Sequence, residues 1–220
     1  MSSLQKIDPQ IYSLIKQEEA RQASDHNMIP SENVVSQAVC EAVGSVLMNK
    51  YSEGQPGKRY YQGNQFIDAI EALVESRALQ VFGLEESKWH VNVQPVTGSL
   101  ANFAVYAAVL NLGDKILAMS LYDGGHLTHG WKMPDTGKSI SFTSRIYDTY
   151  FYNVDPKTRV FDYSHIKARA TAVKPHILIS GGTAYPREID HRHMREIAAS
   201  VGAIYMADVA HEAGLIAGGA

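Results

Sequence analysis

Five short clusters of polar residues and glycines in this sequence contain groups that could bind a charged ligand or transfer protons. The first, Pro95-Val96-Thr97-Gly98-Ser99-Leu100-Ala101-Asn102, places two hydroxyls and a glycine at the start of a predicted helix. Free N–H groups and the helix dipole at such a position favour a phosphate. A plain helix N-cap uses the same residues without a ligand, so this cluster alone leaves both interpretations open.

A carboxylate and two histidines stand out in the next two clusters. Asp208 ends an apolar segment in Ala207-Asp208-Val209-Ala210-His211, and a carboxylate at a buried strand end requires a partner. A protonated ring nitrogen, a Mg²⁺ ion or a structural hydrogen bond would each serve. His126 and His129 lie in the segment 123–130, where an imidazole could stack on a flat ligand or simply be satisfied within a loop. No carboxylate or cysteine completes a zinc-like set with them, so we expect no metal site.

The last two clusters are loops. Gly181-Gly182-Thr183-Ala184-Tyr185-Pro186-Arg187 offers a hydroxyl and flexible backbone after a predicted strand, although a simple turn would look the same. The loop from Tyr51 to Gly63 contains Glu53 and Tyr61 among glycines, and Glu and Tyr side chains suit proton transfer. An ordinary solvated loop is the alternative.

Apolar segments alternate with amphipathic ones and predict the elements that position these clusters. Strands are expected at 115–120, 176–180 and 203–207, helices at 99–110, 163–172 and 191–201, and a strand or hairpin at 141–153. This alternation predicts an α/β fold, a mostly parallel sheet with helices on both faces. Because ligands bind beyond the carboxyl ends of such strands, we expect the clusters after the strands to meet at one sheet edge.

The first part of the chain reads as helical. Asp8-Pro9 is a helix start signal for residues 8–22, and further helices are expected at 36–48 and 66–82. We therefore expect residues 1–50 to form a helical arm and the start of the fold, and residues 51–220 to form a large ligand-binding domain.

Composition excludes several classes of protein. A net charge of −3 leaves no basic excess for a nucleic-acid partner, and the apolar stretches are too short to cross a membrane. Cys40 is the single cysteine, so no intrachain disulfide forms, which fits a reducing compartment. The polar N-terminus has no apolar signal-peptide core. These features predict a cytoplasmic protein.

Taken together and in this order, the clusters resemble serine hydroxymethyltransferase, a pyridoxal-phosphate (PLP) enzyme. The resemblance implies the PLP-dependent transferase fold type I, which is aspartate aminotransferase-like, with residues 51–220 as its PLP-binding large domain. The matching stretches are Ser31-Glu32-Asn33, Asn49 to Gly54, Gly57 to Tyr61, Asn92 to Pro95, Gly98-Ser99, Ala101 to Tyr106, Gly124 to Gly130, Ala207-Asp208 and Ala210-His211.

The resemblance also implies most of a PLP site. Asp208 would pair with the pyridine nitrogen, and His126 would stack on the ring and take part in catalysis. The remaining cofactor-binding residues would be Thr97, Gly98 and Ser99 at the phosphate, Thr183 and His211 near the phenolic oxygen, and Tyr51 from a neighbouring subunit.

The implied substrates are L-serine or glycine and tetrahydrofolate. Glu53 would be the acid/base group at the serine hydroxyl and folate, with Tyr61 nearby, and both would act from the neighbouring subunit of a homodimer or tetramer. Ser31 would bind the substrate carboxylate. The folate pocket would be lined by Leu121, Gly125 and Leu127.

The implied reaction moves the serine hydroxymethyl carbon reversibly to tetrahydrofolate, giving glycine and 5,10-methylenetetrahydrofolate. The family's cofactor-binding lysine is expected beyond Ala220, and no lysine follows Lys174. We therefore expect an N-terminal portion, incomplete at its C-terminus and inactive alone. A non-catalytic truncated remnant and a related PLP aldolase are the alternatives, and the Tyr51–Tyr61 loop favours the transferase over the aldolase.

Overall fold

A computed structural model describes residues 2–29 and 31–219. The chain divides into two compact units, Met1–Lys50 and Tyr51–Ala220. The first unit contains α1 (Ser3–Ile7) and α2 (Pro9–Ser24), followed by α3 (Gln37–Val43). The Asp8 carboxylate caps α2 by accepting from the Ile11 amide at 3.0 Å, with Pro9 in the first helical position. The predicted helix over 8–22 is confirmed.

The single helix predicted over 36–48 is wrong. α3 ends at Val43, and a separate 3-10 helix, η1, covers Val46–Asn49. The Gly44 amide donates to the Cys40 carbonyl, and the Ser45 hydroxyl then accepts from the Leu47 amide at 3.4 Å. Serine competes for backbone groups in this way, and glycine lowers helix propensity, so the pair ends one helix and begins another.

The second unit begins with a small hairpin that the loop prediction did not include. β1 (Gly54–Gln55) pairs with β2 (Lys58–Arg59) in antiparallel register, and α4 (Gln65–Val81) follows. The helix predicted over 66–82 is therefore confirmed within one residue at each end.

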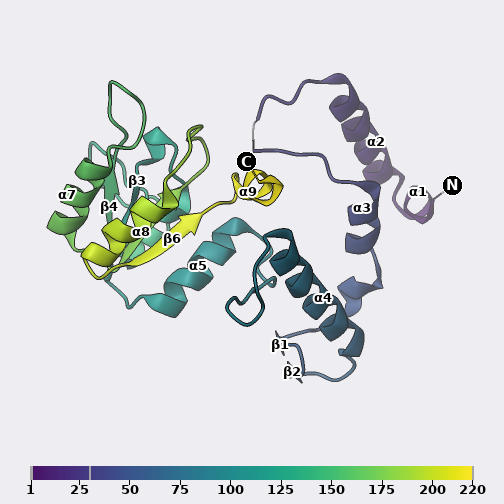
Figure 1. Ribbon diagram of the computed structural model, residues 1–220. Coiled ribbons are helices and arrows are strands. Elements are labelled where there is room, and N and C mark those ends of the chain that lie inside the picture. Colours follow the sequence, from purple (N-terminus) through teal and green to yellow (C-terminus); the bar gives the residue numbers. More distant parts are fainter. Residues whose placement is uncertain (1, 30, 220) are drawn as a thin grey trace. The chain divides into compact units, whose positions relative to one another are not determined.

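A four-stranded parallel sheet forms the centre of this unit, and its order is β4-β3-β5-β6 (Figure 1). The expected α/β class is confirmed. All four strands end at the same edge, where short 3-10 turns, η2 (Leu121–Asp123) and η3 (Leu127–His129), follow β3. The strands are β3 (Lys115–Met119), β4 (Asp148–Tyr152), β5 (Ile177–Gly181) and β6 (Ile204–Asp208); the helices are α5 (Gly98–Val109), α7 (Tyr163–Val173), α8 (His191–Ser200) and α9 (Ala213–Gly218).

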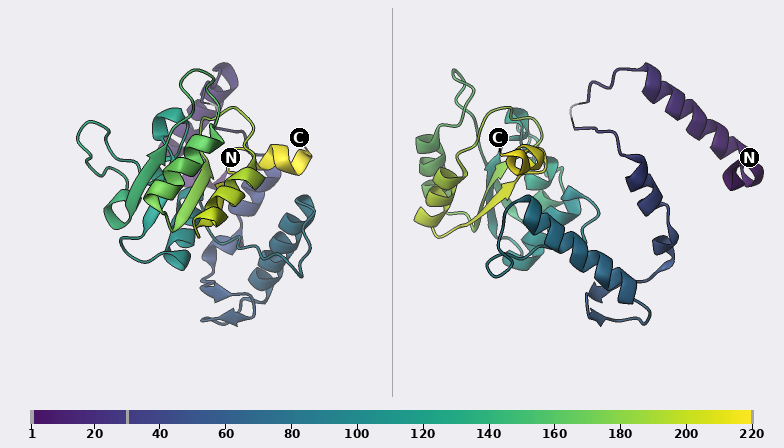
Figure 2. Two further views of the ribbon diagram at one scale, coloured as in Figure 1. Left: turned by 60° about the vertical axis from the view of Figure 1, so that its left-hand side comes forward. Right: turned by 45° about the vertical axis from the view of Figure 1, so that its right-hand side comes forward.

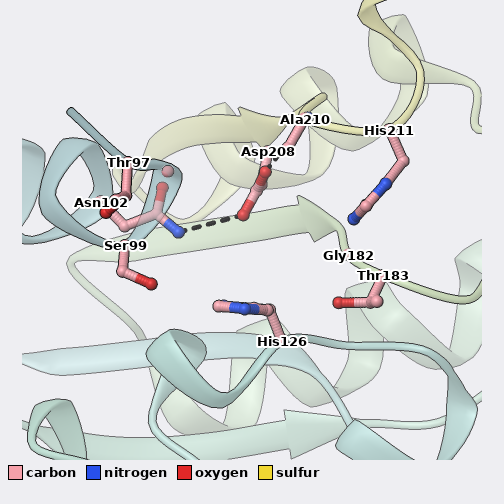
Figure 3. A pocket seen from close by; sticks show the side chains of 10 residues that line it. Thr97, Ser99, Asn102, His126, Gly182, Thr183, Asp208, Ala210 and His211 are labelled. Carbon is pink, nitrogen blue, oxygen red and sulfur yellow. Dashed lines mark hydrogen bonds between the residues drawn. The ribbon is translucent and has the colours of Figure 1, made fainter. Parts of the chain in front are cut away.

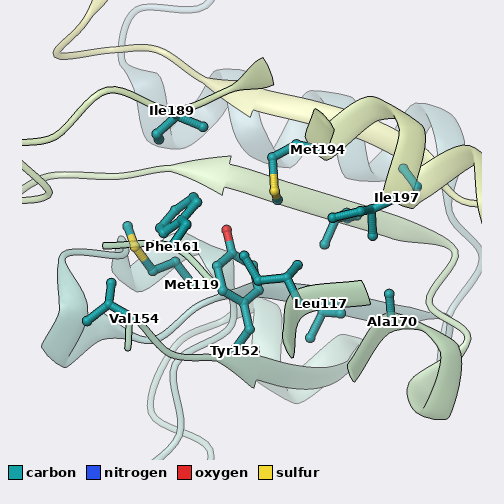
Figure 4. Close-up of a cluster of buried hydrophobic side chains, with 12 residues drawn as sticks. Leu117, Met119, Tyr152, Val154, Phe161, Ala170, Ile189, Met194 and Ile197 are labelled. Carbon is teal, nitrogen blue, oxygen red and sulfur yellow. The ribbon is translucent and has the colours of Figure 1, made fainter. Parts of the chain in front are cut away.

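Both faces of the sheet are covered, because side chains alternate between them along each strand. Ile116 and Ala118 of β3 pack with Tyr106 of α5 on one face. Leu117 and Met119 face the opposite way into a larger core with α7 and α8, which lie against each other (Figures 2 and 4). The fully buried Tyr152 closes this core, and its hydroxyl donates to the Ile179 carbonyl at 2.9 Å. Burial on both faces explains the continuous apolar runs of β3 and β5.

The hairpin considered for residues 141–153 is not formed. The first half is a short helix, α6 (Thr143–Ile146), and only the second half is a strand, β4, which runs parallel to β3. The Ser141 hydroxyl accepts from the Ser144 amide at 3.2 Å, and Thr143 donates its hydroxyl to the Thr128 carbonyl at 2.7 Å. These side-chain bonds favour a helical turn where β-branched residues suggested a strand.

Candidate functional site

A pocket of about 210 Å³ lies at the carboxyl edge of the sheet. Four of the five sequence clusters contribute to it: the three that follow strands, as the strand-end argument predicts, and the start of α5. Figure 3 shows their side chains converging from α5, from the loops after β3 and β5, and from the turn after β6. The lining residues are Thr97, Gly98, Ser99, Asn102, His126, Gly182, Thr183, Asp208, Ala210 and His211.

The start of α5 forms one wall of the pocket. Thr97 is the N-cap, and its hydroxyl oxygen accepts from the Leu100 amide at 3.3 Å. The plain N-cap interpretation is thus correct for Thr97, yet the first-turn amides of Gly98 and Ser99 have no intrahelical partner by the geometry of a helix start. With the Ser99 hydroxyl directed into the pocket (Figure 3), this wall offers donors for an anion.

Asp208, the last residue of β6, also lines the pocket and is 12% exposed at its side chain. Its Oδ2 accepts from Asn102 Nδ2 at 3.0 Å and from His129 Nε2 at 2.9 Å. Its Oδ1 accepts only a long bond, 3.3 Å, from the Ala210 amide within the part of the chain that the structure describes. Oδ1 therefore keeps acceptor capacity on a residue that lines the pocket.

These partners determine the charge of Asp208. Burial by itself would raise the pKa of this carboxyl, but the hydrogen bonds from His129 and Asn102 outweigh burial and hold the pKa well below its ordinary value. Asp208 is consequently ionised at neutral pH and can stabilise a cationic group in the pocket.

His126 is held in one orientation by the same network. Asn102 Nδ2 also donates to the Thr128 hydroxyl oxygen at 2.9 Å, and Thr128 in turn donates its hydroxyl proton to His126 Nδ1 at 2.7 Å. Nδ1 additionally accepts from the Thr128 amide, so the ring proton is on Nε2. Burial, and then the neighbouring His129, lower the pKa of His126, which keeps the ring neutral.

Asn102, Thr128 and His129 were not among the predicted site residues. Asn102 is three residues after Ser99, and His129 is three residues after His126. In a helical turn, residues three apart lie on the same face, so this spacing could have indicated both residues. Spacing does not reveal that Asn102 bridges Asp208 and Thr128, which are 106 and 26 residues away in sequence. All three are buried or nearly so, which only the fold decides.

Close contact between glycines sets the geometry of the pocket floor. A Cβ on Gly182 would lie 2.2 Å from the Gly124 carbonyl oxygen, and a Cβ on Gly181, where φ is +88°, would lie 1.9 Å from the Asp208 carbonyl oxygen. The Thr183 amide donates to the same Gly124 carbonyl at 2.7 Å. Only glycine permits these approaches, and they hold Thr183 and Asp208 beside the loop that carries His126.

The three residues predicted to line a folate pocket do not come together. Leu121 lines a neighbouring pocket of about 270 Å³ that also contains Arg159 and Arg187. Gly125 is buried, and a Cβ there would lie 2.2 Å from the Met119 carbonyl oxygen, so its role in the structure is close packing. Leu127 is 48% exposed. The folate role of all three stays a prediction.

Tyr51, Glu53 and Tyr61 are not among the residues that line the pocket. The rings of Tyr51 and Tyr61 lie 5.7 Å apart, and Glu53 is exposed. Arg59, 4% exposed, donates to the Asp68 carboxylate at 2.7 Å and to the carbonyls on both sides of Glu53 at 2.7 Å. This arginine therefore anchors the loop that presents Glu53. Ser31 is an exposed residue of the first unit.

Comparison with known proteins agrees with these motifs. Residues 4–220 match the family model described as serine hydroxymethyltransferase. The chain is 53% identical over 219 residues to the serine hydroxymethyltransferase of Desulfotalea psychrophila, which covers 100% of this chain and 49% of that protein. It is 46% identical over 216 residues to the Caenorhabditis elegans serine hydroxymethyltransferase, and this match covers 98% of this chain and 42% of that protein. It is 44% identical over 210 residues to the mitochondrial serine hydroxymethyltransferase of Saccharomyces cerevisiae, and this match covers 96% of this chain and 43% of that protein.

The chain therefore spans less than half the length of these relatives. The match nevertheless runs through both units and includes every cluster around the pocket. Because it extends from residue 4 to residue 220, the chain belongs to the serine hydroxymethyltransferase family, whose members have the fold type I architecture that the motifs predict.

Proposed function

We propose that this chain supplies the phosphate, ring and ring-nitrogen contacts of a PLP site that serves reversible transfer of the serine hydroxymethyl carbon to tetrahydrofolate. The observation that supports this most directly is the ionised Asp208. It lines the same pocket as Gly98 and Ser99, whose amides begin α5, and as the neutral His126, which lies to one side of Asp208 and Ser99 (Figure 3). An anion site and a cation site in one small pocket match a ligand that carries a phosphate and a protonated ring.

The residues present fit PLP by the chemistry of their donors and acceptors. Gly98 and Ser99, with Thr97, would hold the phosphate at the start of α5. Asp208 Oδ1 has acceptor capacity for a ring N–H, and the His126 ring, fixed by Thr128, would cover a flat ligand. Thr183 and His211 line the remaining side, where they would contact polar substituents.

When bound, PLP supplies an electron sink for the charge that develops at the amino-acid carbon. Asp208 would keep a proton on the ring nitrogen, because its low pKa makes it a stable anion. His126 would orient the ring and exclude water from one face. Glu53, with Tyr61, would move the proton at the serine hydroxyl, and Ser31 would bind the substrate carboxylate.

The assembly and location of the protein are also proposals. Glu53, Tyr51 and Tyr61 would complete the pocket of a neighbouring copy, which requires at least a homodimer. We place the protein in the cytoplasm on the single cysteine, although some relatives are named mitochondrial or chloroplastic. Within residues 2–29 and 31–219, no helix is both long enough and apolar enough to cross a bilayer.

Binding of 4′-deoxypyridoxine 5′-phosphate to the 220-residue chain tests the proposal. This compound has the ring and phosphate of PLP but no aldehyde, so it requires no lysine. We expect saturable binding by isothermal titration calorimetry. Asp208→Asn should weaken it about 10- to 100-fold, since a hydrogen bond to a charged group contributes about 1.5–3 kcal/mol.

Asp155→Asn is the matched control, because hydrogen bonds from Thr158 and Lys157 also lower the pKa of Asp155, far along the chain from the pocket residues. We expect its affinity to equal that of the unsubstituted chain. Equal affinity in folded Asp208→Asn would refute the proposed site.

A further inference from the structure

A second polar network lies outside the pocket, between α8 and the start of α9. We call it the His191 network and define it as Ser180, Tyr205, His191 and Glu212. The Tyr205 hydroxyl lies 2.5 Å from Ser180 Oγ and 2.7 Å from His191 Nδ1. His191 Nε2 lies 3.3 Å from a Glu212 carboxylate oxygen. The side chains of this network therefore connect four elements: β5, β6, α8 and the N-cap of α9.

The chemistry of these groups determines the direction of each bond. The Glu212 carboxylate can only accept, so His191 Nε2–H donates to it. With the ring proton on Nε2, Nδ1 accepts from the Tyr205 hydroxyl, and Tyr205 accepts the proton of the fully buried Ser180 hydroxyl. Every donor has an acceptor in this arrangement, which makes the network a directed chain from the sheet to Glu212.

The network is anchored at a rigid place. Asp190 caps α8 by accepting from the His193 amide at 2.9 Å, and its own amide donates to the Tyr163 hydroxyl at 2.8 Å. The His193 ring stacks on Tyr163 with centroids 4.5 Å apart. His191, the first residue of α8, therefore projects from a fixed helix start, and its side chain is only 35% exposed.

The other end of the network reaches the pocket. Glu212 directly follows His211 in a tight turn, in which the Glu212 and Ala213 amides donate to the Val209 carbonyl at 3.0 and 2.8 Å. The same turn contains the Ala210 amide that donates to Asp208 Oδ1. Asp208 is fixed by β6 and by its bonds from Asn102 and His129, so it is the outer end of the turn, residues 210–212, that Glu212 ties to α8.

We propose that His191 and Glu212 are positioning residues that hold the outer end of the turn after β6 against α8, so that His211 keeps its place in the pocket. The effect on a ligand rests on the proposed function, whereas the effect on the turn does not. Two measurements separate these parts.

Amide hydrogen exchange, resolved by NMR, tests the turn without any ligand. Glu212→Ala and His191→Ala should each accelerate exchange at Ala210 and Ala213 about three- to tenfold, while amides of β5 stay unchanged. Glu212→Gln should restore protection, because its carboxamide oxygen still accepts from His191 Nε2–H. The double alanine variant should exchange no faster than either single variant, since both remove one contact. Glu196→Ala, an exposed glutamate on the same helix, is the control.

Calorimetric titration of the same variants with 4′-deoxypyridoxine 5′-phosphate tests the pocket. Affinity should fall in parallel with the loss of protection in the two alanine variants and recover in Glu212→Gln. Wild-type exchange at Ala210 and Ala213 in both alanine variants would overturn the proposal. If the unsubstituted chain fails to bind the probe, the proposed function fails, while the exchange measurement still decides whether His191 and Glu212 hold the turn.

Discussion

Replacing Asn102 with alanine should destabilise the second unit, because Asn102 bridges the buried Thr128 and the largely buried Asp208. Its Nδ2 donates to Asp208 at 3.0 Å and to Thr128 at 2.9 Å, and its side chain is 6% exposed. After Asn102→Ala, Asp208 keeps His129 and Thr128 keeps His126 as partners. Neither partner is left alone, which places the cost at the lower end of the usual range.

The magnitude follows from the two lost bonds. A bond to a charged group contributes about 1.5–3 kcal/mol and a neutral bond about 1 kcal/mol, so we expect a loss of about 2–3 kcal/mol. With a urea m-value of about 2 kcal/mol/M, the unfolding midpoint should fall by about 1–1.5 M. Circular dichroism at increasing urea concentration measures this shift directly.

Asn153→Ala provides the matched control. Asn153 Nδ2 donates to the Asp123 carboxylate at 2.7 Å, the same chemistry at an exposed position. Water replaces a bond of this kind, so its loss should move the midpoint by no more than about a quarter of the Asn102 effect. If the two variants shift the midpoint equally, the argument from burial is wrong.

The pH dependence of the Asn102 effect has a definite sign. The folded pKa of Asp208 lies below its ordinary value of 3.8, so the stabilisation is present above that value and is lost as pH falls through the folded pKa. The stability gap between the unsubstituted chain and Asn102→Ala should therefore be full at pH 7 and narrow below about pH 4. A gap that widens on acidification would contradict the assignment of an ionised Asp208.

Two further predictions concern packing. Gly125→Ala should lower the melting temperature by several degrees or prevent folding, because the added Cβ would meet the Met119 carbonyl oxygen at 2.2 Å, whereas Gly214→Ala, with open space around it, should change little. Arg59→Lys should accelerate chymotryptic cleavage within residues 51–63, because an ammonium cannot reproduce the contacts of the guanidinium. The control, Lys58→Arg, should leave the cleavage rate unchanged. Equal cleavage rates in both variants would show that Arg59 does not anchor the loop.

Much of the candidate site followed from local sequence. Ser99 after a glycine predicts a helix start, and Asp208 after an apolar run predicts a strand end. Since parallel strands end at one edge, Asp208 had to meet the loops after β3 and β5 there, whereas only the fold brought the start of α5 to the same edge. The helix predicted over 36–48 failed, because Gly44 and Ser45 make local bonds that a hydrophobic pattern does not reveal.

Sequence by itself determined the α/β class, the sheet edge at which the candidate ligand-binding residues after the strands gather and, through long motifs, the family. Each of these depends on periodicity or on residues adjacent in the chain. Tertiary structure alone decided which groups touch. It placed Asn102 between Asp208 and Thr128, Leu121 outside the main pocket, and Glu212 on His191. The physical reason is that hydrogen bonds depend on distances of about 3 Å between side chains, and packing of separate elements sets such distances.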